Sequence, residues 1–322
     1  MAEWDATPPT AVPGVPYTSA RWPCLGRTND SKNIPSRENE MTTVAVLGAG
    51  ALGAAMATRL AEGGFDVCLW NRTAARAEEV AAESGRVVAA GTVAVAVADA
   101  DVVLTVLRDG PAVAAVAEEM LPAMRSDAIW VQVSTVGPVD AHELRDSAAS
   151  QGITFLDAPV SGSTPQVQQG ALLWLVSGQD AAVNIARPVL ERLGKEVVVV
   201  GAGLEASALK LAMNTWLAAS TVAIADVLKV CDALEVPHET LVRTLQATPL
   251  AMPFAFAKID LMEKQQYPAG FAVDLALKDI ELTLQNAELR LPFLEAVRER
   301  LKATVRAGHG REDVAAVYEA EQ

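Results

Sequence analysis

Short runs of β-branched and other apolar residues alternate with longer Ala-rich stretches over residues 42–202. Such a run is typical of a buried strand, and the longer stretches are typical of helices. We predict strands at 44–47, 67–70, 102–107, 129–133, 153–156, 172–176 and 197–200. Because strands that alternate with helices form βαβ units, the pattern predicts an α/β fold with a mostly parallel, doubly wound sheet of the Rossmann type.

The pattern changes after Gly203, where the strand-like runs stop. Helical stretches follow, separated by Pro237, Pro253 and Pro268. Proline has no backbone N–H to donate within a helix, so each marks a helix boundary or a loop. The first of these helices, at about 204–233, is apolar on more than one face, which favours burial between domains or subunits. We therefore expect a Rossmann domain at 41–202 and an all-α domain at 203–322 that completes the substrate site and forms a homodimer.

Residues 1–40 contain six prolines among small polar residues and show no helical or strand period. This composition predicts a disordered leader before Met41.

Composition narrows the classes of partner. The 322 residues carry a formal net charge of −14, which argues against nucleic acid and anionic membranes as partners. The three cysteines lie far apart and form no C-x-x-C pair, which argues against zinc and redox chemistry and favours the cytoplasm. The apolar stretch 211–228 contains Asn214, Ser220 and Asp226, so we expect no membrane span.

A glycine-rich turn follows the first predicted strand. In VAVLGAGALG, Gly48, Gly50 and Gly53 form a G-x-G-x-x-G pattern, with Ala49, Ala51 and Leu52 between them. In a dinucleotide-binding turn the first glycine allows the tight turn, the second admits the pyrophosphate, and the third allows close helix–strand packing. Backbone N–H groups and the helix dipole then hold the phosphates. We expect residues 48–53 to bind a dinucleotide.

The end of the second strand indicates which dinucleotide is preferred. Asn71, Arg72 and Thr73 lie where a Rossmann domain meets the adenosine ribose. An acidic residue there accepts hydrogen bonds from the ribose 2′-hydroxyl of NAD, whereas a guanidinium and polar donors suit the 2′-phosphate of NADP. The sequence therefore favours NADP(H) over NAD(H).

A lysine on the long predicted helix is the candidate for proton transfer. Lys210 and Asn214 are four residues apart, so they share one face of that helix. Hydride transfer to a carbonyl produces an alkoxide that needs a proton, and a buried lysine with a lowered pKa can donate it. We expect Lys210 to be the general acid or base and Asn214 to bind the same oxygen or orient the lysine.

These segments together resemble the β-hydroxyacid dehydrogenase family, which includes 3-hydroxyisobutyrate dehydrogenases and tartronate semialdehyde, glyoxylate and succinic semialdehyde reductases. The likeness runs over about residues 44–291. It includes the glycine-rich turn, the NRT at 71–73, VSTVGP at 133–138, DAPVSGS at 157–163 followed by Gly170, Lys210 with Asn214, and an F-x-x-x-L-x-x-K-D ending in Lys278 and Asp279.

The resemblance implies roles for several residues. Leu107, Thr135 and Lys278 would contact the cofactor, and Lys278 would close over it from the helical domain. Ser134 would lie beside Thr135 at the substrate, and Ser161, Gly162 and the N–H of Ser163 would bind the substrate carboxylate, as small residues in a turn expose backbone donors to an anion.

Two departures from the family pattern concern the substrate. The family usually has Ser-Gly-Gly where this chain has Ser161-Gly162-Ser163, and the glycine turn before Lys210 is longer than usual. An imine reductase therefore remains an alternative, although such enzymes generally place another residue where Lys210 stands. A non-catalytic NADP-binding scaffold is a second alternative. A 6-phosphogluconate dehydrogenase is rejected, because its Lys-x-x-His-Asn motif reads Lys-Leu-Ala-Met-Asn here.

Overall fold

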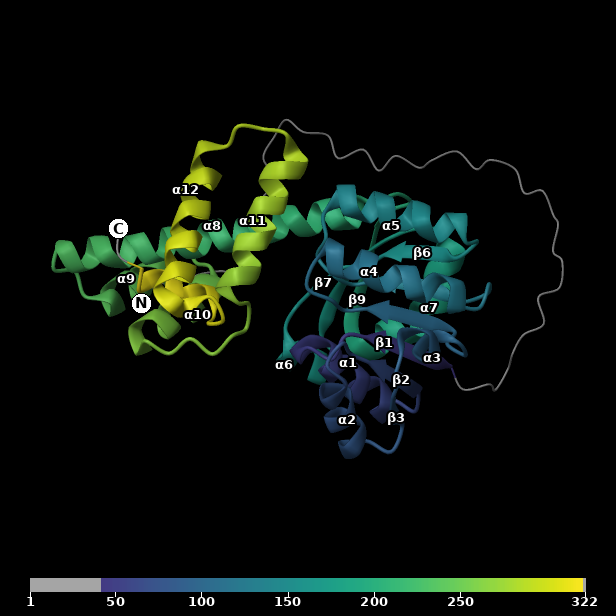
Figure 1. Cartoon of the computed structure of the whole chain (residues 1–322). Helices are drawn as coiled ribbons and strands as arrows, with labels where there is room; N and C mark the ends of the chain where they lie inside the picture. The colour runs from purple at the N-terminus through teal and green to yellow at the C-terminus, as the bar shows by residue number, and fades with distance from the viewer. Residues whose placement is uncertain (1–41, 321–322) are drawn as a thin grey trace, which may run out of the picture. The chain divides into compact units, whose positions relative to one another are not determined.

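The computed structural model describes residues 42–320, which begin with a nine-stranded sheet (Figure 1). Its strands are β1 (Thr43–Leu47), β2 (Asp66–Trp70), β3 (Val87–Ala89), β4 (Val102–Thr105), β5 (Ile129–Gln132), β6 (Thr154–Asp157), β7 (Val160–Ser161), β8 (Leu172–Ser177) and β9 (Gly194–Gly201). They are ordered β3-β2-β1-β4-β5-β6-β8-β7, and β9 pairs with β8. The first six positions have the strand order of a dinucleotide-binding Rossmann sheet.

Each predicted run forms a strand, and the sheet is mostly parallel, as predicted. Only β8 runs antiparallel to its neighbours β6 and β7. The pattern missed β3 and β7, whose three and two residues are too few to show a period. It also placed the end of β4 two residues too late, because the chain leaves the sheet after Thr105 and turns over the glycine-rich segment.

Helices cover both faces of the sheet. They are α1 (Ala51–Glu62), α2 (Ala74–Glu83), α3 (Val93–Val97), α4 (Gly110–Met120), α5 (Pro138–Ser150), α6 (Thr164–Gln168) and α7 (Asp180–Leu193). In β1, Val44 and Val46 enter the core that contains α1 and α7, whereas Ala45 and Leu47 enter the core that contains α4 and α5. Successive side chains of a strand point to opposite faces, so this division shows the doubly wound fold.

The chain becomes helical after Gly201, as predicted. It continues through α8 (Glu205–Ala233), α9 (His238–Gln246), α10 (Pro253–Lys264), α11 (Val273–Ala287) and α12 (Pro292–Thr304), then a π-helical turn, η2 (Val305–His309), and a 3₁₀ helix, η3 (Val314–Tyr318). Pro237 precedes α9, Pro253 opens α10, and Pro268 lies in the loop before α11. These helices enclose a third apolar core. The predicted disordered leader lies outside the described residues.

The long helix α8 is the one described helix that is long and apolar enough to cross a membrane, with a mean hydropathy of 1.4 over its best window. We expected Asn214, Ser220 and Asp226 to exclude a membrane span, but by length and hydropathy alone they do not. In the fold, α8 packs against α10, α11, α12 and η3 (Figure 1). A helix that is partly buried along its length in this way is typical of a protein core.

Candidate active site

The glycine-rich turn between β1 and α1 leaves space for a ligand at one glycine and none at the other two. Gly48 has a φ of +119°, and a Cβ there would lie 2.3 Å from the carbonyl oxygen of Val106. A Cβ at Gly53 would lie 1.9 Å from the carbonyl oxygen of Gly48. A Cβ at Gly50, by contrast, would meet nothing within 4 Å. Gly48 and Gly53 are thus needed for the fold, and the open face at Gly50 fits the approach of a pyrophosphate.

Asn71 ties the end of β2 to this turn. Its side-chain oxygen accepts from the N–H of Ala49 at 3.0 Å, and its Nδ2 donates to the carbonyl of Thr73 at 2.9 Å. Arg72 and Thr73 are exposed beside it, and the Thr73 hydroxyl makes no capping bond to α2. Asn71 therefore shapes the turn, while Arg72 and Thr73 remain accessible to a ligand.

The ends of β4 and β5 are joined through Ser134. The Ser134 hydroxyl donates to the carbonyl of Thr105 at 3.2 Å and accepts from the N–H of Leu107 at 2.8 Å. The side chain of Gln132 bonds both backbone groups of Ser134 at 2.8 Å. The Ser134 hydroxyl is buried and holds the loop after β5 to the end of β4, and its contact with a substrate stays a prediction. Leu107 is placed in turn beside Gly48.

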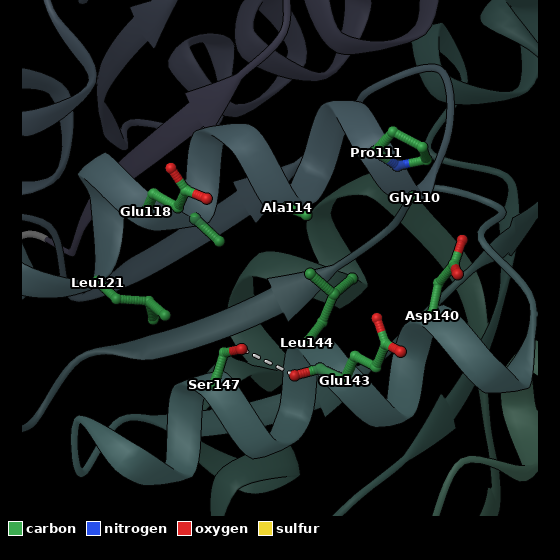
Figure 2. A pocket seen from close by; sticks show the side chains of 10 residues that line it. Gly110, Pro111, Ala114, Glu118, Leu121, Asp140, Glu143, Leu144 and Ser147 are labelled. Atoms are coloured by element: carbon green, nitrogen blue, oxygen red, sulfur yellow. Dashed lines mark hydrogen bonds between the residues drawn. The ribbon is translucent and has the colours of Figure 1, made fainter.

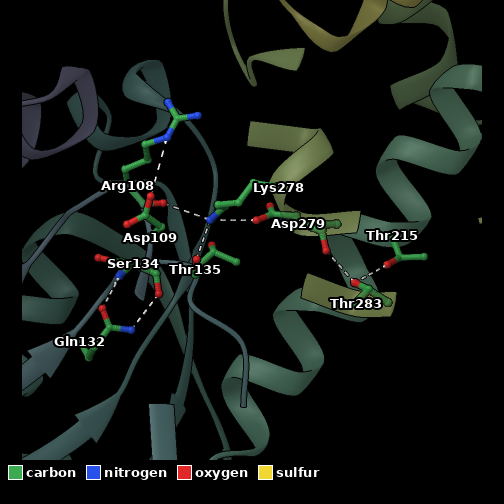
Figure 3. A network of polar contacts seen from close by, with 10 residues as sticks. Arg108, Asp109, Gln132, Ser134, Thr135, Thr215, Lys278, Asp279 and Thr283 are labelled. Carbon is green, nitrogen blue, oxygen red and sulfur yellow. Dashed lines mark hydrogen bonds and ion pairs between the residues drawn. The ribbon is translucent and has the colours of Figure 1, made fainter. Parts of the chain in front are cut away.

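Lys278 of α11 contacts the segments that follow β4 and β5 (Figure 3). Its ammonium donates to the carbonyl of Thr135 at 2.6 Å and to that of Arg108 at 3.1 Å. An ion pair between Arg108 and Asp274, at 3.0 Å, lies at the same contact. Lys278 thus bonds the loops that follow β4 and β5, and its contact with a cofactor stays a prediction.

Asp279, the residue after Lys278, connects it to the candidate proton donor. The Asn214 amide donates to Asp279 Oδ2 at 2.5 Å, and Lys278 Nζ lies 3.0 Å from Asp279 Oδ1 as an ion pair without hydrogen-bond geometry. Burial lowers the pKa of Lys210 to about 8; the negative charge of Asp279 opposes that change, and the positive charge of Lys278 adds to it. The structure therefore brings Lys210, Asn214, Lys278 and Asp279 together.

The predicted substrate turn contains a capping arrangement that the sequence analysis missed. Gly162 has a φ of +131°, and Ser161 ends β7. Ser163 precedes α6, and both its N–H and its hydroxyl donate to Gln166 Oε1, at 2.9 and 2.8 Å. The Ser163 N–H therefore already has an acceptor within the protein, and its bond to a substrate carboxylate stays a prediction. A Ser-x-x-Gln spacing before a helix is the signature of a capping box and could have indicated this.

A groove of about 290 Å³ between α4 and α5 is separate from these residues (Figure 2). Apolar side chains and the carboxylates of Glu118, Asp140 and Glu143 line it, and none of the predicted site residues does. Within residues 42–320, no group of three or more His, Cys, Asp or Glu residues is arranged to hold a metal ion.

Two protein families match consecutive parts of the chain. Residues 43–201 match the NAD-binding domain of 6-phosphogluconate dehydrogenase, and residues 204–320 match the NAD-binding domain of NADP-dependent 3-hydroxyisobutyrate dehydrogenase. The two matches meet where the sheet ends and α8 begins.

Relatives match over most of their length. A probable 3-hydroxyisobutyrate dehydrogenase of Mycobacterium tuberculosis is 31% identical over 257 residues, 76% of this chain and 85% of that protein. The chloroplastic glyoxylate/succinic semialdehyde reductase 2 of Arabidopsis thaliana is 28% identical over 96% of this chain and 88% of its own. The structure of M. tuberculosis 3-hydroxyisobutyrate dehydrogenase with L-serine superposes with a TM-score of 0.80 at 27% identity, covering 87% of this chain and 99% of that one.

Proposed function

Because the chain belongs to the β-hydroxyacid dehydrogenase family, we propose that it is an NADP-dependent oxidoreductase acting on a small 3-hydroxy acid, semialdehyde or keto acid. The family itself supports oxidoreductase activity with a nicotinamide dinucleotide. The choice of NADP, the catalytic lysine and the substrate class are the proposal.

The observation that carries the proposal is the environment of Lys210. A pKa of about 8 keeps a large fraction of the side chain protonated near neutral pH while making the proton easy to transfer. Asn214, held by Asp279, supplies a fixed amide next to it on α8. In the direction of reduction, Lys210 donates a proton to the substrate oxygen; in the direction of oxidation, it removes one.

The bound cofactor would supply or accept the hydride. It would be held by the glycine turn together with Arg72, Thr73, Leu107, Thr135 and Lys278. Contacts run continuously between these residues: Leu107 lies beside Gly48, Ser134 bonds Leu107, and Lys278 bonds the carbonyl of Thr135. The same lysine pairs with Asp279, whose charge acts on Lys210. The cofactor turn and the proton donor are therefore linked through the ends of β4 and β5.

The central experiment is a substrate panel with a matched pair of variants. Succinic semialdehyde, glyoxylate, tartronate semialdehyde, 3-hydroxyisobutyrate and a cyclic imine are each followed by NADPH or NADP absorbance. Lys210→Ala is expected to lower turnover by about two to four powers of ten with NADPH affinity intact. Lys264→Ala, which removes an exposed lysine on α10, is the control and should change neither.

Each other outcome of the panel indicates a different function. Unchanged turnover in Lys210→Ala refutes the proposed proton donor. Reduction of the cyclic imine alone indicates an imine reductase, and NADPH binding without turnover of any compound indicates a non-catalytic scaffold.

The preference for NADP is proposed from Arg72. This exposed guanidinium follows the strand end that meets the adenosine ribose and suits a 2′-phosphate. Arg72→Asp should shift the ratio of kcat/KM values from NADPH toward NADH by at least about tenfold, the effect of roughly 1.4 kcal/mol. An unaltered ratio would place the 2′-phosphate elsewhere.

We also propose that the enzyme is a cytoplasmic homodimer. Along α8, Leu209, Trp216 and Val230 are exposed at multiples of seven residues, and Trp216 is 66% exposed. A repeat of seven is the spacing by which helices pair, and a large exposed apolar stripe marks an interface. Sedimentation should show a dimer that Trp216→Glu dissociates; a monomeric wild type would refute this part.

A further inference from the structure

We propose that Asp157, at the end of β6, is a positioning residue that sets the place of Lys210 relative to the substrate turn at Ser161–Ser163. The inference rests on the proposed function, because it concerns how the same lysine is held.

Two hydrogen bonds connect Asp157 to the first turn of α8. Asp157 Oδ2 accepts from the N–H of Ser207 at 2.8 Å, and Oδ1 accepts from the Ser207 hydroxyl at 2.7 Å. Asp157 is fully buried and Ser207 is 2% exposed, so water does not replace these bonds. Ser207 lies one helical turn before Lys210, and a fixed first turn fixes the direction in which Lys210 leaves the helix.

Asp157 is also the first residue of the segment that carries the substrate turn. Three residues separate it from Ser161 in β7, whose pairing with β8 fixes the backbone at Ser161 and Leu173. One carboxylate therefore connects the strand end before the substrate turn with the helix turn before the proton donor. The gap in sequence between the two bonded residues is 50, so no local pattern links them.

Burying a carboxylate to cap a helix costs free energy, because burial disfavours its charged form. Burial raises the pKa of Asp157 to about 6, the two bonds from Ser207 oppose that rise, and the nearby charge of Glu205 adds to it. A serine performs the neighbouring capping task without a charge, since Ser177 Oγ accepts from the N–H of Ala206 at 2.9 Å. The two-pronged acceptor at Asp157 holds both the backbone and the side chain of Ser207, which a single hydroxyl does not.

The test compares three variants with a remote control. Asp157→Ala removes both bonds, Ser207→Ala removes one, and Asp157→Asn keeps an acceptor for the N–H and a donor for the hydroxyl. Thr92→Ala removes the cap of α3, where Thr92 accepts from the N–H of Val95. Asp157→Ala should lower kcat by about ten- to a hundredfold, with KM for NADPH changed less than about twofold. The kcat of Ser207→Ala should lie between those of Asp157→Ala and the wild type. Asp157→Asn should retain most of the wild-type kcat. Thr92→Ala should lower stability without lowering kcat.

A measurement without turnover separates this inference from the proposed function. The rate at which trinitrobenzenesulfonate labels Lys210, followed by peptide mass spectrometry across pH, reports the pKa of that lysine in the presence of its neighbours Asp279 and Lys278. The wild type should titrate near pH 8. Asp157→Ala should titrate closer to the ordinary lysine value of about 10.4, because a displaced first turn returns the ammonium to water.

The outcomes are distinct. A wild type that reduces no compound of the panel refutes the proposed function, while a labelling shift in Asp157→Ala still supports the positioning role. The same labelling midpoint in both proteins, or an Asp157→Asn enzyme as slow as Asp157→Ala, overturns it. If Asp157→Ala does not fold, Ser207→Ala decides by the same two measurements.

Discussion

Substituting alanine at two glycines of the cofactor turn should separate ligand binding from folding. At Gly50, an added Cβ meets no protein atom within 4 Å, and the φ of −71° is one that alanine adopts readily. The smaller conformational freedom of the unfolded chain offsets the poorer helix cap, so the midpoint of thermal unfolding should stay within about 2 °C of the wild type. At Gly53, the Cβ would lie 1.9 Å from a carbonyl oxygen, which forces α1 away from β1 and costs about 1–3 kcal/mol.

NADPH affinity should respond to the substitution at Gly50, where thermal stability does not. In Gly50→Ala, the methyl group occupies the space through which the pyrophosphate approaches the backbone N–H groups. Losing one charge-assisted hydrogen bond costs about 1.5–3 kcal/mol, which corresponds to a roughly ten- to hundredfold weaker Kd. The assay is a titration of NADPH fluorescence together with thermal unfolding of the free protein. An unchanged Kd in Gly50→Ala, or an unchanged unfolding midpoint in Gly53→Ala, would refute the assignment of these glycines.

Three further predictions concern charged groups. The rate of carbonyl reduction should fall as pH rises through about 8, because Lys210 loses the proton it donates, and Asp279→Asn should lower that midpoint by removing the negative charge that supports the ammonium; a flat profile would contradict this. The folded state holds a proton on Asp157 up to about pH 6, whereas the unfolded state loses it near 3.8, so this group's contribution to stability falls by about 3 kcal/mol as pH rises from about 4 to 6. In urea unfolding, the free energy of unfolding of the wild type should fall relative to that of Asp157→Asn as pH rises across that range. A difference between the two proteins that stays constant with pH would exclude the effect. Lys278→Met keeps the apolar stem but loses the bonds to the carbonyls of Arg108 and Thr135, which should raise KM for NADPH about tenfold or more; an unchanged KM would show that the contact does not serve the cofactor.

The sequence predicted those parts of the fold that are encoded by local pattern. A buried strand needs several apolar residues in succession, so β1, β4, β5 and β8 could be recognised, whereas the two residues of β7 could not. The glycine turn was recognisable because backbone sterics require glycine at Gly48 and Gly53, and the approach of a pyrophosphate requires open space at Gly50; the structure has no room for a Cβ at the first two positions and open space at the third.

Two of the predicted substrate contacts involve groups that already have partners within the protein. The Ser163 hydroxyl and N–H both donate to Gln166 at the start of α6, and the Ser134 hydroxyl bonds two backbone groups at the end of β4. The motif alone does not show these internal partners. In a folded chain, a buried or partly buried donor first needs a partner within the protein, and it reaches a ligand only if that partner is absent or replaceable.

The residues that orient the proton donor could not be found from the sequence, for a different physical reason. Asn214 and Asp279 are 65 residues apart, and Asp157 and Ser207 are 50 apart. Neither pair shares a helix face or a strand period, so each meets only because α11 packs on α8 and β6 ends beneath the start of α8. The lysine itself is visible as a residue type at a motif position, but its pKa of about 8 depends on charges and burial that this packing creates. The candidate reacting group can thus be recognised from a local motif, whereas its pKa depends on contacts between segments that are distant in the sequence.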